Sequence, residues 1–202
     1  DLGSVQSAAK RNLDLLEPHV DAGSKVVALQ PSCAMMLRRE YPELVAEEDR
    51  ERARNVADAV RDPSEYLWSI RKEDRFSTDF KSAPSARVSY HAPCHLRAQS
   101  VGFRGRDLIR QIDGVDKIST VMECCGHDGT HAMKVEGFDA SIRAGARSFE
   151  AMKDADAEVW VTDCSLAAIQ FEQHAGVRAM HPMSVLARAY RADGFSKALE
   201  KK

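Results

Sequence analysis

The chain lacks the features of membrane-spanning, secreted or nucleic-acid-binding proteins. No apolar run approaches the roughly 20 residues that a membrane-spanning helix needs. No secretory signal opens the sequence, which begins Asp1-Leu2-Gly3-Ser4 in a helical pattern. The 31 Asp and Glu residues nearly balance the 29 Lys and Arg residues, so the formal net charge is −2. Bulk charge therefore gives no reason to expect binding to nucleic acid or anionic lipid.

Closely paired cysteines are also absent. The five Cys residues form no CxxC pair of the kind found in small zinc domains, and their spacing differs from that of ferredoxins. An odd number of cysteines argues against the closed disulfide framework of a secreted domain. Clustered cysteines in a reducing compartment are more often metal-binding or redox-active. We therefore expect a cytoplasmic protein.

Short apolar runs alternate with segments of helical periodicity. The pattern predicts strands over 25–30, 87–91, 118–122, 158–162 and 177–181. It predicts helices over 3–22, 34–40, 46–73 (divided at Pro63), 104–112, 135–153, 165–174 and 182–192. This alternation is typical of an α/β fold, with Rossmann-like βαβ units around a mostly parallel sheet.

The cysteines all follow predicted strands, at their carboxyl ends. In open α/β sheets ligands bind at this edge, and the helix N-termini that follow favour thiolates. Thiolates select iron–sulfur clusters, zinc or Cu(I). The spacing Cys94-x29-Cys124-Cys125-x38-Cys164 is long, so a preformed fold must bring these ligands together. The alternative is that the cysteines simply pack in a core, which is the preferred interpretation for Cys33 taken alone.

Several motifs in order resemble the CCG (cysteine-rich) domain family. They are Cys124-Cys125-Gly126, the segment 91–95 (HAPCH), the segment 162–164 (TDC), the segment 31–42 (PSCAMMLRREYP) and the segment 181–183 (HPM). Nearly the whole chain is similar to the C-terminal half of iron–sulfur proteins of two kinds. These are proteins like the B subunit of heterodisulfide reductase and proteins like the C subunit of anaerobic glycerol-3-phosphate dehydrogenase.

The resemblance implies a division of the chain, because members of this family usually carry two CCG repeats. Residues 1–45 would be the truncated end of a first repeat, 46–83 a charged helical connector, 84–192 the second repeat and 193–202 a polar tail. Since the chain also begins without Met, we expect a part of a longer subunit whose N-terminal half is missing.

The resemblance also implies a cofactor, an iron–sulfur cluster of the 4Fe–4S type, cubane or non-cubane, with zinc as the alternative. Its expected ligands are Cys94, Cys124, Cys125 and Cys164. Ala167 and Gln30 stand where the family often has Cys. Cys33 and His127 are further candidate ligands, and the sequence assigns no catalytic residue.

The expected function is that of an electron-transfer subunit or fragment of an oxidoreductase rather than a complete enzyme. It would pass electrons between a flavoprotein or ferredoxin-type partner and a quinone or disulfide acceptor. One alternative is catalytic disulfide reduction at the cluster, as in heterodisulfide reductase. Another is a zinc-bound or metal-free domain for subunit assembly. Any membrane association would come through a partner.

Overall fold

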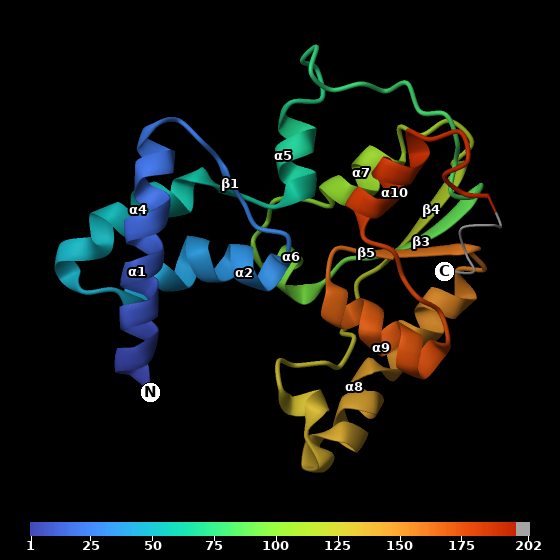
Figure 1. The fold of residues 1–202 in the computed structure, drawn as a ribbon. Helices are drawn as coiled ribbons and strands as arrows, with labels where there is room; N and C mark the ends of the chain where they lie inside the picture. Colours follow the sequence, from blue (N-terminus) through green and yellow to red (C-terminus); the bar gives the residue numbers. More distant parts are fainter. Residues whose placement is uncertain (197–202) are drawn as a thin grey trace. The chain divides into compact units, whose positions relative to one another are not determined.

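The computed structural model describes residues 1–196, which divide into two compact units (Figure 1). Unit 1 is Asp1–Tyr66 and unit 2 begins at Leu67. The division falls within helix α5 (Pro63–Ser69), inside the stretch 46–83 that the sequence predicts as a connector. Residues 197–202, which end the predicted polar tail 193–202, lie outside the described residues.

Unit 1 is mostly helical. Before α5 its elements are α1 (Leu2–Asp21), β1 (Val26–Val27), α2 (Pro31–Met35), the π-helical segment η1 (Met36–Glu40), α3 (Tyr41–Leu44), η2 (Glu47–Asp49), α4 (Arg50–Ala59) and β2 (Val60–Arg61). The two short strands pair in parallel. The core forms where α1, α3 and α4 meet, around the buried side chains of Leu13, Tyr41 and Val56. The apolar positions of α1 and α4 recur at helical spacing, which places them on one face of each helix.

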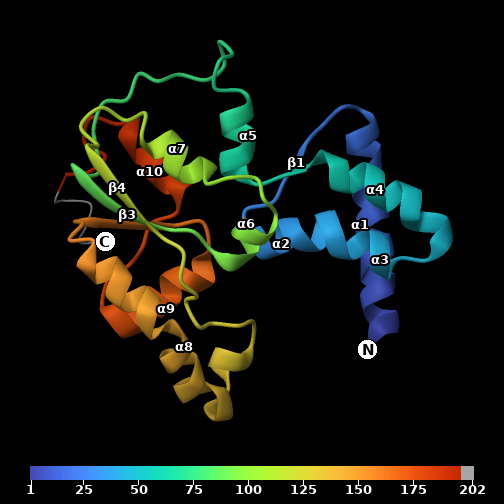
Figure 2. The same cartoon turned by 180° about the vertical axis from the view of Figure 1, so that it is seen from behind.

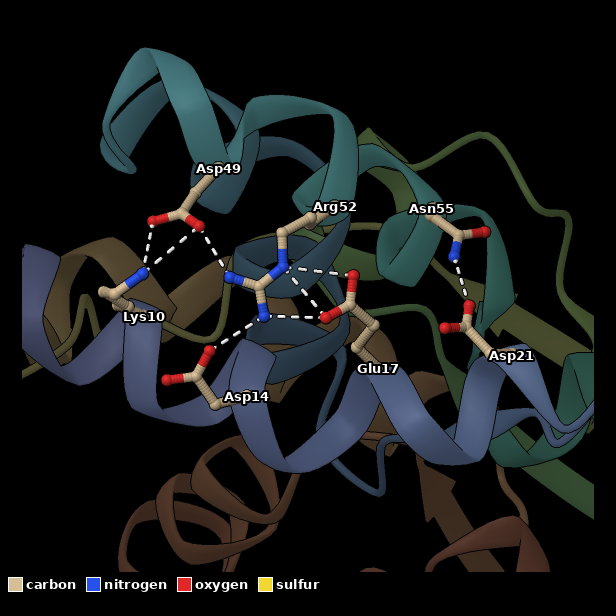
Figure 3. A network of polar contacts seen from close by, with 7 residues as sticks. All are labelled: Lys10, Asp14, Glu17, Asp21, Asp49, Arg52 and Asn55. Atoms are coloured by element: carbon tan, nitrogen blue, oxygen red, sulfur yellow. Dashed lines mark hydrogen bonds and ion pairs between the residues drawn. The ribbon is translucent and has the colours of Figure 1, made fainter.

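A charged network joins α1 to α4 in unit 1 (Figure 3). The Arg52 guanidinium donates to Asp14 at 2.8 Å, to Glu17 at 2.7–3.0 Å and to Asp49 at 2.6 Å. Asp49 is only 5% exposed and also accepts a hydrogen bond from Lys10 Nζ at 3.0 Å. The hydrogen bonds from Lys10 and then Arg52 hold the pKa of Asp49 below its usual value. Charge-assisted bonds thus satisfy a buried carboxylate.

Unit 2 contains a three-stranded parallel sheet with the order β4-β3-β5. Its strands are β3 (Arg87–His91), β4 (Lys117–Val121) and β5 (Val159–Thr162). Its helices are α6 (Cys94–Ala98), α7 (Arg104–Ile109), η3 (His131–Met133), α8 (Val135–Asp154), α9 (Ser165–Ala175) and α10 (Pro182–Ala189). The predicted α/β class with parallel strands is therefore confirmed. The strand predicted at 177–181 is reduced to one parallel bridge between Val161 and Met180.

Helices cover both faces of this sheet. Figures 1 and 2 show α7 and α10 on one face and α8 and α9 on the other. Alternate residues of β3 point to opposite faces, as the strand pleat requires. Val88 and Tyr90 enter the core under α7 and α10. Ser89 contacts Met152 of α8, and His91 packs against Phe171 of α9.

Unit 1, together with α5, repeats the order of the second half of unit 2. A 20-residue helix, α1 or α8, precedes a short strand in each. That strand pairs in parallel with a segment further along the chain, Val27 with Arg61 and Val161 with Met180. A helix with proline at its start follows, α5 or α10. The residue before this proline accepts the backbone N–H two positions on, at 2.8 Å in unit 1 and 3.1 Å in unit 2.

The Arg52 network should stabilise unit 1. Arg52→Met keeps the apolar stem of the side chain but removes its three ion pairs and leaves Asp49 with Lys10 alone. We expect the free energy of unfolding to fall by about 1 kcal/mol in urea titrations. The difference should shrink in 1 M salt, where the Debye length is about 3 Å. Arg54→Met, at an exposed position of α4, is the control. Equal losses in the two variants would contradict this role.

The low pKa of Asp49 also predicts a pH dependence. A carboxyl whose folded pKa lies below its ordinary value, 3.8, stabilises the fold fully above that value. This contribution is lost as the pH falls through the folded pKa. Asp49→Asn should therefore be less stable than the native chain at neutral pH, and the two should converge in acid. Urea midpoints measured from pH 7 down to below 3.8 test this, and a constant difference would refute it.

Candidate metal centre

The three parallel strands of unit 2 bring four cysteines to one cavity. Parallel pairing puts the carboxyl ends of β3, β4 and β5 at the same edge of the sheet. The first turn after each strand carries cysteine, at the start of α6, in the turn after β4 and at the N-cap of α9. The cavity at this edge has a volume of about 380 Å³. Four of the predicted site residues line it together, namely Cys94, Cys124, Cys125 and Cys164.

The two further candidate ligands lie in different places. His127 lines the same cavity, is buried, and its Nδ1 has no hydrogen-bond partner among the described residues. Cys33 is exposed and lines a separate apolar cavity of about 610 Å³ within unit 1, between α1, β1 and α2. The structure thus groups His127 with the four cysteines and places Cys33 in the other unit.

Burial keeps two of the thiols protonated. It raises the pKa of Cys125 to about 12, against the effect of the His127 backbone N–H, and nearby thiolates, Cys164 first, add to the rise. Burial also raises the pKa of Cys164, although the N–H groups of Ala167 and Leu166 at the start of α9 favour its thiolate. Gathering thiolates in this cavity therefore requires a cation among them, since metal binding offsets their mutual repulsion.

The cavity does not hold its donors in a finished coordination geometry. Within residues 1–196, no group of three or more His, Cys, Asp or Glu side chains is arranged so that it could hold a metal ion. The five cysteines are all free thiols. The donor chemistry therefore fits a thiophilic metal or cluster, while the side chains would have to adjust on binding.

Helix α8 supports the double-cysteine turn. Gly126 has φ of +80°, and a Cβ there would lie 2.1 Å from the Ser141 carbonyl oxygen. Ser141 Oγ donates to the Gly126 carbonyl at 2.7 Å, and Gln170 Nε2 donates to the Cys125 carbonyl at 3.1 Å. A Cβ at Gly145 would come within 2.6 Å of the same Cys125 carbonyl. The turn thus rests directly on the backbone of α8.

These supporting residues were not among the site residues predicted from the sequence. Ser141 and Gly145 are spaced one helical turn apart, with Gly137 one turn before them, so α8 carries a stripe of small buried residues. That spacing was the available signal. It indicates a helix face that another backbone approaches closely, although it does not identify the approaching segment.

The sequence comparisons agree with this geometry. Residues 88–172 match the family model of the cysteine-rich domain, CCG. The match runs from β3 into α9 and includes the four cysteines of the cavity. Residues 88–172 are a CCG cysteine-rich domain. The family predicted from the sequence motifs is therefore confirmed.

Curated relatives extend the similarity into unit 1. The chain is 32% identical over 168 residues to the C subunit of anaerobic glycerol-3-phosphate dehydrogenase from Escherichia coli K12, covering 83% of this chain and 41% of that protein. It is 25% identical to the B subunit of fumarate reductase (CoM/CoB) from Methanothermobacter marburgensis, covering 95% of this chain and 37% of that protein. The chain thus spans about two fifths of the length of these relatives.

Lactate utilization protein A of Bacillus cytotoxicus is 28% identical over 138 residues, covering 66% of this chain and 55% of that protein. Similarity therefore extends to proteins named for two different oxidoreductases and for lactate utilization.

None of the helices described within residues 1–196 is both long and apolar enough to cross a bilayer.

The close packing of the double-cysteine turn against α8 can be tested by substituting two glycines. Gly126→Ala forces a Cβ into backbone atoms of Ser141 and Gly145, which cannot move aside separately. We expect a loss of roughly 3 kcal/mol in stability. Gly129→Ala is the matched control, since its φ is also positive, +59°, but a Cβ would meet nothing within 4 Å. It should cost only about 1 kcal/mol. Similar losses in thermal unfolding would argue against close packing at Gly126.

Proposed function

We propose that this CCG domain is the iron–sulfur-binding, electron-transfer part of an oxidoreductase. The observation that carries the proposal is the meeting of four cysteines in one cavity, at the ends of three parallel strands. Their sequence spacing is long because each cysteine-bearing turn follows a different strand. The names of two relatives, a dehydrogenase subunit and a fumarate reductase subunit, support an oxidoreductase.

The proposed ligands are Cys94, Cys124, Cys125 and Cys164. Four thiolates are the usual ligand set of a 4Fe–4S cluster. Ala167, where the family often has a fifth cysteine, is fully buried in the core beneath the site and does not line the cavity. This favours four protein thiolates over five. His127 is the additional candidate within the cavity.

Bound, the cluster would supply reversible one-electron transfer. The protein's contribution would be to hold the thiols and set their electrostatic surroundings. The Gly126 N–H donates to Cys124 Sγ at 3.3 Å, and the N–H groups of Leu166 and Ala167 favour the Cys164 thiolate, as that of His127 favours the Cys125 thiolate. Such hydrogen bonds stabilise the more negative, reduced state and raise the reduction potential.

The wider assembly is also part of the proposal. A flavoprotein or ferredoxin-type partner would supply or receive electrons, with a quinone or disulfide as acceptor. The repeated element order from α1 to α5 supports a first CCG repeat that includes residues 1–45 and continues to α5. Free thiols, rather than disulfides, favour a reducing cytoplasmic location.

Metal and acid-labile sulfide analysis of protein purified without oxygen tests the function. We expect about four iron and four sulfide per chain, with a brown chromophore. Cys124→Ser should lose the chromophore, because it removes a proposed ligand. Cys33→Ser should keep it, because Cys33 lines a different cavity. Electron paramagnetic resonance of the reduced protein would distinguish a cubane from a non-cubane cluster.

Two results would overturn the proposal. About one zinc ion per chain without sulfide would identify a structural domain. A colourless, metal-free chain even after reconstitution with iron and sulfide would leave the cysteines as core residues.

A further inference from the structure

A buried histidine links two of the cysteine-bearing turns. His91 is the last residue of the central strand β3, and its register partners are the last residues of the flanking strands, Val121 and Thr162. Its side chain is only 1% exposed. It therefore lies beneath the edge of the sheet at which the cysteines gather, and it also lines their cavity.

Both ring nitrogens of His91 have partners. Nε2 lies 3.1 Å from the Glu123 carbonyl oxygen, and Nδ1 lies 3.0 Å from Thr162 Oγ1. A carbonyl only accepts, so Nε2 carries the proton and donates it to Glu123. Nδ1 then accepts from the Thr162 hydroxyl. Thr162 Oγ1 accepts in turn from the Cys164 backbone N–H at 3.4 Å.

The surroundings of the ring favour this one arrangement. Burial lowers the pKa of His91 to about 4, so the ring is neutral at physiological pH and has one donor and one acceptor. Phe171 packs edge-on against it, with ring centroids 5.1 Å apart and an interplanar angle of 83°. The ring is thus fixed both by its hydrogen bonds and by its packing.

The link connects segments that the sheet does not pair with each other. Strands β4 and β5 flank β3 on opposite sides. Glu123 directly precedes the Cys124-Cys125 pair, and Thr162 lies two residues before Cys164. The chain Glu123–His91–Thr162–Cys164 therefore runs across the sheet edge through side-chain hydrogen bonds. Gln170 adds a second connection, from α9 to the Cys125 carbonyl.

We propose that His91, acting through Thr162, is a positioning residue that holds the turn of Cys164 at a fixed separation from the turn of Cys124 and Cys125. The inference deepens the proposed function, on which its metal-binding consequence rests. The positioning of the two turns does not depend on a metal, so it can be tested in the metal-free chain. Without the link, only the Gln170 hydrogen bond would still join α9 to the Cys125 turn, and the thiols should become more accessible in the metal-free chain.

The test removes one hydrogen-bonding atom at a time. Thr162→Val replaces the hydroxyl by a methyl group of similar size in a strand that favours β-branched residues. Thr162→Ser keeps a hydroxyl at this position and should keep the link. Ser89→Ala is the matched control, because Ser89 lies on β3, is fully buried and bonds Met152 Sδ, away from the cysteine turns.

The first measurement is alkylation of the metal-free chain by N-ethylmaleimide, resolved for each cysteine by mass spectrometry. Cys33 in unit 1 is the internal reference. Thr162→Val should raise the alkylation rate at Cys164 relative to Cys33 by about fivefold or more, because it removes both hydrogen bonds of the hydroxyl, to His91 Nδ1 and from the Cys164 N–H. Thr162→Ser and Ser89→Ala should keep the native ratio. Equal ratios in Thr162→Val and the native chain would overturn the proposal.

The second measurement is the affinity of the metal-free chain for Zn²⁺ alone, by competition with a chelator. Outer hydrogen-bond partners of metal ligands typically change affinity by about 10-fold to 100-fold. Thr162→Val should lie in that range and Ser89→Ala should not differ from the native chain. If no variant binds metal, the proposed function fails, and the alkylation ratios still decide the role of His91. If Thr162→Val and Ser89→Ala weaken Zn²⁺ binding equally, the effect is structural and the positioning role is refuted.

Discussion

The parallel pairing of β4 and β5 with β3 is the constraint on which the rest of unit 2 depends. Parallel strands run in one direction, so their carboxyl ends must lie at the same edge. Each returning segment then needs a helix, and these helices cover the two faces of the sheet. The thiols that follow the strands converge although 69 residues lie between Cys94 and Cys164 in sequence. A slip of one residue in register would move both the core side chains and the cysteine turns.

Bringing the cysteines together in one cavity disfavours their thiolate forms, and neighbouring backbone N–H groups partly offset this effect. Cys125 and Cys164 contact the apolar core around Phe171, and burial disfavours their charged forms. Backbone N–H groups at the start of α9 and after the CC pair act in the opposite direction. The balance leaves the Cys125 and Cys164 thiols neutral in the free chain and gives the site a strong preference for a cation once thiolates form. A site of this kind can be specific for thiophilic metals without being a rigid cage beforehand.

Unit 1 uses a different means of stabilisation. It has the element order of the second half of unit 2 but, within the described residues, only a two-stranded sheet. Its core is small, and the ion pairs of Arg52 join α1 to α4 beside that core (Figure 3). Small sheets are marginal on their own, so helix packing and charge-assisted bonds carry more of the stability here than strand pairing does. Cys33 lies in this unit, where it lines a cavity between α1, the two-residue strand β1 and α2.

The sequence by itself determined the α/β class, the limits of most helices and strands in unit 2, the CCG family and the residue types of the site. Local periodicity and turn chemistry encode these features. It did not predict the division within α5, the single bridge at Met180, or the roles of Ser141, Gln170 and His91. These features depend on which segments, distant in the sequence, come into contact in the fold. Only the tertiary structure decided that four of the cysteines share one cavity of unit 2 while Cys33 lines a cavity within unit 1, and that His91 bridges two strand ends, because contacts between distant segments depend on strand order and packing rather than on local pattern.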